Sequence, residues 1–213
     1  MPRVVDHTQR RHEIVSALWA VIYDRGIDGV TLQAVADEAG ISVGRIQHYF
    51  ESKQHLIRAG ALEIVTTAER AHHTRIEQSD PRSELVALLT QPVPTSTPFR
   101  VATAVWYAYV ARAVSDPWIE AFLAETSHGT VQEVARLLHE LGVDRSGDDA
   151  ARNRARYLVA LSNGIAQSVF LGVMDADEAI ELITGEIHQM SASSAGLDGP
   201  GSTRNAQQTP TAR

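Results

Sequence analysis

The chain has 213 residues, of which 44% are hydrophobic and 21% charged, a composition typical of a globular protein and not of a fibrous or wholly disordered chain. It contains no cysteine, which excludes disulfides, thiolate metal sites and cysteine nucleophiles, and no apolar run long enough to cross a membrane. The formal net charge of −7 falls entirely after residue 58, because the first 58 residues hold seven basic and seven acidic side chains. The N-terminus has no apolar signal core, and we therefore expect a cytoplasmic protein without a membrane partner.

Almost every segment has the hydrophobic periodicity of a helix, and none has the alternation of a strand. The predicted helices cover residues 8–25, 32–39, 43–50, 53–78, 80–90, 99–115, 117–141, 149–172 and 176–192. After Ser193 the chain is too polar to bury itself. We therefore predict an all-α protein of about nine helices, with a three-helix head over 1–52, a helical bundle over 53–192 and a disordered tail over 193–213.

Two short helices within residues 32–51 form a helix-turn-helix pattern. Ala36 is the small residue needed where the helices cross, Gly40 suits the left-handed turn, and Thr31 and Ser42 are N-cap residues. The apolar residues of the contact faces are Val35, Ala39, Ile41, Ile46 and Tyr49.

The same pattern fits an ordinary helical hairpin in a bundle. The second helix favours DNA binding, because its remaining residues are not needed for the core and include side chains suited to bidentate contacts with base edges. These surface residues are Val43, Gly44, Arg45, Gln47 and His48.

From Ile14 to Leu56 the sequence resembles the TetR family of bacterial transcriptional regulators. Its anchors follow in order with unbroken spacing: Gly26-Ile-Asp-Gly-Val-Thr-Leu, Val35-Ala-Asp-Glu-Ala-Gly-Ile-Ser-Val-Gly, His48-Tyr-Phe and Ser52-Lys-Gln-His-Leu. The family usually has an aromatic residue where Gln47 stands, and here the aromatic character shifts to residues 48–50, as in the choline-responsive branch. Further along, the chain is similar to the family in its helical layout and in the segment Leu161-Ser-Asn-Gly-Ile-Ala.

The resemblance implies a homodimeric regulator, usually a repressor, that leaves a palindromic double-stranded DNA operator when a small organic effector occupies the C-terminal domain. It also implies that DNA is faced by Thr31, Gln33, Ser42, Arg45, Gln47, His48 and Tyr49, with Lys53 on a phosphate. Arg3, Arg10 and Arg11 would add backbone contacts from a flexible arm, although a solvated terminus explains them equally well.

Six of the twelve aromatic residues fall within residues 99–122. Such a stripe is more often core, but an apolar cavity with few polar groups is also what a small-molecule site needs. We predict an effector site formed by Phe99, Thr103, Trp106, Tyr107, Phe122, Asn163 and Gln167. A largely apolar molecule is the simplest occupant, and a quaternary ammonium cation is the alternative.

The last two helices each carry an apolar stripe, and we predict that the two stripes form a two-fold dimer interface. Its residues are Leu158, Leu161, Ile165, Val169, Ile180, Ile183 and Ile187. The alternative is that these stripes face the core of their own chain.

Two Glu-x-x-His pairs, Glu69 with His72 and Glu125 with His128, permit the alternative of a di-metal carboxylate bundle. That site needs an inward glutamate on two further helices, and neither Glu13 nor Glu186 lies on a helix whose apolar face would turn it inward, so we expect no metal and no cofactor. The absence of a Gly-x-Ser-x-Gly elbow argues against a hydrolase, and we expect no enzymatic activity. A helical interaction module that never binds DNA is the remaining alternative.

Overall fold

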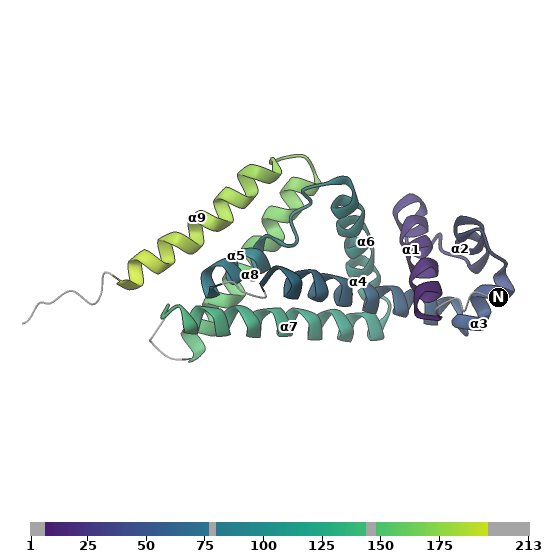
Figure 1. The fold of residues 1–213 in the computed structure, drawn as a ribbon, viewed down its shortest axis with the longest axis horizontal. Helices are drawn as coiled ribbons and strands as arrows, with labels where there is room; N and C mark the ends of the chain where they lie inside the picture. The colour runs from purple at the N-terminus through teal and green to yellow at the C-terminus, as the bar shows by residue number, and fades with distance from the viewer. Residues whose placement is uncertain (1–6, 77–79, 144–147, 196–213) are drawn as a thin grey trace, which may run out of the picture.

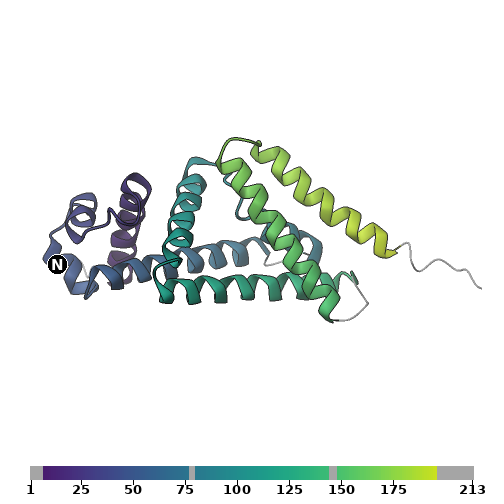
Figure 2. The same ribbon diagram turned by 180° about the vertical axis from the view of Figure 1, so that it is seen from behind.

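The computed structural model describes residues 7–76, 80–143 and 148–195, and within them the chain forms nine helices and no strand (Figures 1 and 2). The helices are α1 (His7–Arg25), α2 (Leu32–Ala39), α3 (Val43–Tyr49), α4 (Lys53–Ile76), α5 (Pro81–Thr90), α6 (Thr97–Ala113), α7 (Pro117–Glu140), α8 (Asp148–Phe170) and α9 (Ala176–Ala195). The all-α prediction is confirmed. No helix in these ranges is long and apolar enough to span a membrane.

The head, α1 to α3, lies at one end of the molecule, and α9 lies at the other (Figure 1). Between them, α4 and α7 run along the same side of the body, while α6 and α8 complete a triangular arrangement with them (Figures 1 and 2). The long helix α4 leaves the head directly and continues into this body. It is therefore the element through which the two parts are joined in sequence.

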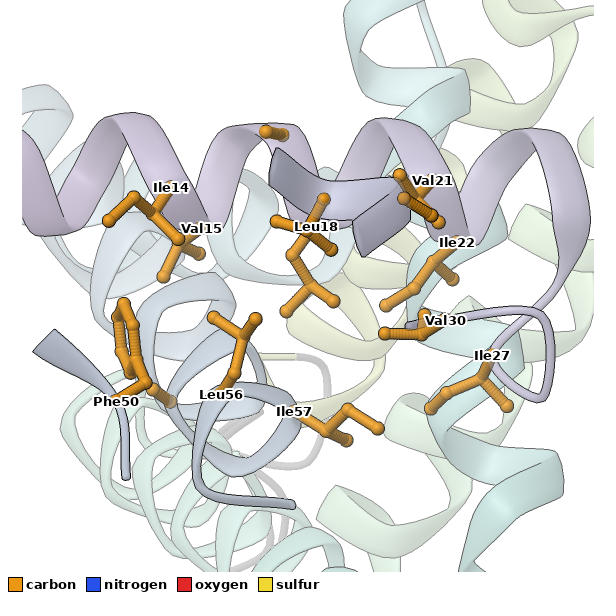
Figure 3. Close-up of a cluster of buried hydrophobic side chains, with 14 of the residues drawn as sticks. Ile14, Val15, Leu18, Val21, Ile22, Ile27, Val30, Phe50, Leu56 and Ile57 are labelled. Atoms are coloured by element: carbon orange, nitrogen blue, oxygen red, sulfur yellow. The ribbon is translucent and has the colours of Figure 1, made fainter. Parts of the chain in front are cut away.

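The core of the head forms on one stripe of α1, where Ile14 and Leu18 are fully buried. Phe50, which ends α3, and Leu56, in the first turn of α4, face this stripe and are also fully buried (Figure 3). The same cluster continues into the body through Ile119 of α7. The head is therefore not closed at residue 52, because the first part of α4 belongs to its core.

Helices α1, α4 and α6 meet closely at Gly60, which is buried. A Cβ at this position would lie 2.5 Å from the Tyr109 hydroxyl and 2.6 Å from the Leu18 side chain. The Tyr109 hydroxyl donates a hydrogen bond to the carbonyl of Ile57 at 2.9 Å, and the Trp19 indole donates to the carbonyl of Gly60 at 3.2 Å. Only a residue without a side chain allows these three helices to approach so closely.

A second core holds the body together. It is formed by α5, α7, α8 and α9, and its fully or almost fully buried side chains include Leu85, Leu137, Leu158 and Ile183. The prolines and aspartates near the helix starts set the boundaries: Asp80 and Asp116 cap α5 and α7 with their side chains, each just before a proline.

Several predicted helix boundaries shift by one to three residues, and the start of α6 and the end of α9 are among them. Helix α6 begins two residues before the predicted start, at Thr97, because Ser96 is extended and Pro98 fits the first turn of a helix. Helix α9 continues to Ala195, so the first three residues of the predicted tail are helical. The rest of that tail, from residue 196, lies outside the described residues.

Candidate DNA-binding interface and effector region

The turn between α2 and α3 has the geometry that the sequence predicts. The Thr31 hydroxyl accepts a hydrogen bond from the Ala34 amide at 3.0 Å, and the Ser42 hydroxyl accepts one from the Arg45 amide at 3.2 Å. Gly40 ends α2 in the left-handed region, with φ of 64°, which allows the next amide to reach back to the carbonyl of residue 36. The N-caps of α2 and α3, together with Gly40 between them, therefore fix the direction of α3 relative to α2.

Helix α3 has two distinct sides. Ile46 is fully buried in the head core, and Val43 and Tyr49 are half-buried against it. The opposite side is exposed and carries four of the predicted DNA-facing residues: Gly44, Arg45, Gln47 and His48. A guanidinium and an amide on an exposed helix surface can each make paired hydrogen bonds to a base edge.

Four further predicted DNA contacts are also exposed: Thr31, Gln33, Ser42 and Lys53. Thr31 stands at the start of α2, and Gln33 follows on its surface, where its amide donates to Asp37 at 2.7 Å. Lys53 is the first residue of α4, and the Ser52 hydroxyl caps this helix by accepting from the His55 amide at 3.0 Å. An ammonium group beside free helix amides suits a phosphate.

Gly44 stands out among the exposed residues of α3. A Cβ built on Gly44 meets no atom within 4 Å, and its φ is not in the left-handed region. Neither packing nor backbone conformation within the chain therefore requires a glycine at this position. The missing Cβ leaves room for another backbone to approach this side of α3 closely.

Arg10 and Arg11 are not part of a free arm, which corrects the flexible-arm interpretation. Both lie within α1 and are half-buried. Arg10 pairs with Glu13 at 2.6 Å, and Arg11 donates to the carbonyl of Tyr49 at 2.9 Å. Arg3 lies outside the described residues.

The start of α4 is tied to the body through Asp116, a buried carboxylate. Gln54 donates to Asp116 at 2.7 Å, and an Arg58 nitrogen lies 3.9 Å from it. The Arg58 guanidinium also covers the Trp118 ring at 5.0 Å. These contacts join the helix turn that carries Lys53 to the beginning of α7.

The predicted effector residues lie on three helices of the body, α6, α7 and α8. Phe99 is 38% exposed, and Asn163 and Gln167 are also exposed. The Thr103 hydroxyl donates to the carbonyl of Phe99, its neighbour one helical turn earlier, at 2.9 Å. Two open hollows lie elsewhere, one along α9 and one beside Val114, and neither includes a predicted effector residue.

Four aromatic side chains of this region pack in two pairs. The Phe122 ring stacks on the Trp118 ring, with centroids 5.4 Å apart. The Tyr107 ring meets Phe170 at 5.4 Å, and the Arg100 guanidinium lies 4.8 Å from the centre of the same Phe170 ring. Sequence reasoning missed Phe170 and Arg100, because a contact between the start of α6 and the end of α8 leaves no local signal.

The predicted dimer stripe requires a correction. Its members Leu158, Ile165, Val169, Ile183 and Ile187 are all buried in the second core of their own chain. Leu161 and Ile180 are half-buried at the edge of that core. The packing of α8 and α9 against α5 and α7 takes up this stripe, so an interface on these helices must use their exposed sides.

The two Glu-x-x-His pairs do not converge. His72 is buried and lies 3.9 Å from Glu84, whereas Glu125 and His128 are exposed on α7. In the described ranges no three histidine, aspartate or glutamate side chains come together in a way that could hold a metal ion.

The fold and the exposed recognition surface define a helix-turn-helix regulator with a helical C-terminal domain. A family model for bacterial regulatory proteins of the tetR family matches residues 14–59, and a model for the C-terminal domain of BetI-type transcriptional repressors matches residues 81–192, more than half of the chain. The chain therefore belongs to the TetR family of transcriptional regulators.

Individual relatives agree with this assignment. The chain is 26% identical to the regulator BetI of Pseudomonas aeruginosa PAO1, over 92% of this chain and 100% of that protein. It is 33% identical to the regulator PksA of Bacillus subtilis, over 53% of this chain and 56% of that protein.

Solved structures share the fold. A transcriptional regulator from Rhodococcus sp. Rha1 matches with a TM-score of 0.74 at 20% identity, covering 86% of this chain and 96% of the other. A regulator from Saccharomonospora viridis, solved in complex with choline, matches with a TM-score of 0.72 at 23% identity, covering 85% and 95%.

Proposed function

We propose that this regulator is a BetI-type repressor that binds a palindromic DNA operator as a homodimer and leaves it when a small organic effector binds the body. The observation that carries the proposal is the two-sided helix α3, with Ile46 buried and Arg45 and Gln47 exposed. In a helix-turn-helix protein this second helix enters the major groove.

Arg45 and Gln47 read base edges, and Lys53 neutralises a phosphate. Lys53→Ala therefore weakens binding to all sequences and lowers the salt dependence by about one phosphate contact. Gln47→Ala changes the preference at one base pair, at a cost of about 1–3 kcal/mol.

The experiment starts from the duplex that the wild-type protein selects from a random-sequence pool. Affinities for this duplex and for a scrambled duplex of equal length are measured over a salt series. Arg25→Ala is the control, because Arg25 is exposed and lies fourteen residues beyond Arg11 on α1, or about 21 Å along the helix axis. If Lys53→Ala and Gln47→Ala both bind the selected duplex within twofold of wild type, α3 and α4 do not face DNA.

The homodimer uses the exposed sides of α8 and α9. Tyr157 on α8 and Leu182 on α9 are about half exposed, at 50% and 49%. A Cβ at Gly164 or at Gly185 meets nothing within 4 Å in its own chain, so both helices have room for a close neighbour on these sides. Helices with small residues on a shared side can approach closely across a two-fold axis.

The effector is a small organic molecule that contacts the aromatic groups of α6 and α8. Ring faces in this region already attract cations, since the guanidinium of Arg100 lies over Phe170. This contact and the choline bound to the regulator from Saccharomonospora viridis make choline the first compound to test, beside an uncharged apolar compound of similar size. The effector needs only to favour the arrangement that binds DNA poorly.

A further inference from the structure

The first turns of α1 pack against the C-terminal end of the recognition helix α3. Arg11 makes two contacts there: its guanidinium donates to the Tyr49 carbonyl at 2.9 Å and lies 4.5 Å from the centre of the Phe50 ring. One turn earlier, the ring of His7 meets the Tyr49 ring at 4.6 Å. Arg11, which would contact DNA if it belonged to a free N-terminal arm, is thus bound within the head.

This contact acts on the weakest end of the recognition helix. Helix α3 has only seven residues, too few to be stable without its packing. Its last carbonyls have no partner within the helix. A cationic side chain at a helix C-terminus can donate hydrogen bonds to such carbonyls, and its charge interacts favourably with the negative end of the helix dipole. The backbone amide of Phe50 closes the helix by donating to the carbonyl of Ile46, and the Phe50 ring is fully buried.

Arg11 therefore holds the end of α3 from two directions. The guanidinium donates to the carbonyl and lies over the buried Phe50 ring, and Phe50 cannot move without disturbing the head core. A tilt of α3 would move its exposed residues across the groove, so the contact controls the angle at which base edges are read.

We infer that Arg11 is a positioning residue for operator recognition, which sets the orientation of α3 and makes no phosphate contact itself. This inference rests on the proposed operator binding. It separates Arg11 from Lys53, whose role is a charge presented to DNA. The two roles differ in a measurable way, because an oriented helix affects sequence preference and a phosphate contact affects all DNA equally.

The test compares the selected duplex with the scrambled duplex of equal length over a salt series. In Arg11→Ala, affinity for the selected duplex falls roughly ten- to a hundredfold, about the loss caused by one or two wrong base pairs. Affinity for the scrambled duplex and the salt slope stay at the wild-type values. Arg11→Met, which keeps an apolar chain against Phe50, gives the same loss of preference with a smaller loss of thermal stability.

Arg10→Ala is the matched control, since it removes the same charge from the adjacent position, where Arg10 is paired with Glu13. Its ratio of affinities for the two duplexes stays at the wild-type value.

Two outcomes overturn the inference. If Arg11→Ala weakens both duplexes and lowers the salt slope by about one, Arg11 is a phosphate contact. If it weakens both duplexes equally without changing the slope, Arg11 only supports folding. A wild-type protein without any preference for its selected duplex would instead refute the operator-binding proposal on which the inference depends.

Discussion

Gly44→Ala should make the protein more stable and a poorer DNA binder. The position is exposed within α3, its φ is not in the left-handed region, and an added Cβ meets no atom within 4 Å. Alanine at such a site restricts the unfolded chain and stabilises the fold by about 0.4–1 kcal/mol. For a chain of this size, that gain corresponds to a rise of about 1–4 °C in melting temperature.

The same methyl group projects from the exposed side of the recognition helix, against which we propose that DNA packs closely. A methyl group forced into a well-packed contact costs about 1–3 kcal/mol. The affinity for the selected duplex should therefore fall by roughly five- to 150-fold. The loss of binding would occur in a protein that is folded better than wild type, which excludes misfolding as its cause.

The assay pairs a thermal melt with fluorescence anisotropy of the labelled duplex. Gly129→Ala is the control, because Gly129 is an exposed glycine on α7 that also has no atom within 4 Å of an added Cβ. It should gain similar stability and bind DNA normally. Wild-type affinity in Gly44→Ala would show that this side of α3 does not touch DNA, and a lower melting temperature would show that the site is not open.

Leu182→Asp should yield monomers in sedimentation and lose operator binding, because a charge on the exposed side of α9 disrupts the proposed interface. The control Val173→Asp, at a turn residue that is 79% exposed, should remain dimeric. A dimeric Leu182→Asp protein would exclude this interface. Trp106→Ala should bind the selected duplex normally. It should lose most of the effector response, a decrease in DNA affinity of roughly 5–150-fold that is measured by titrating choline or the apolar compound into the complex. An unchanged response would place the effector site elsewhere. Gly60→Ala should lower stability in urea unfolding by about 1–3 kcal/mol, because the added methyl would overlap the Tyr109 hydroxyl; unaltered stability would mean that the three helices separate easily.

The helix-turn-helix could be predicted because its determinants are local. Thr31, Gly40 and Ser42 act on amides and carbonyls within a few residues, so a capping pattern in the sequence becomes a hydrogen-bond pattern in the structure. The alternation of buried and exposed positions along α3 also follows from helical periodicity alone.

The dimer stripe and the effector site could not be predicted in the same way. An apolar stripe with Leu158 and Ile183 shows that a helix buries one side, but not whether the partner is its own chain or another. The contact of Tyr107 with Phe170 joins residues far apart in sequence. Arg11 looked like a member of a charged terminus, because nothing in its neighbours reveals the Tyr49 carbonyl that it meets.

The shared core between the head and α4 limits how heads can be exchanged between regulators. A chimera joined at residue 52 would leave behind Leu56, which is fully buried against α1, and the close approach at Gly60. A graft that keeps its DNA specificity would need to carry the chain through residue 61, together with a residue at position 109 that fits the transplanted helix. The head and the body of this regulator are thus separate along the sequence, but they share the core around Leu56 and Gly60, which must be transferred as a whole.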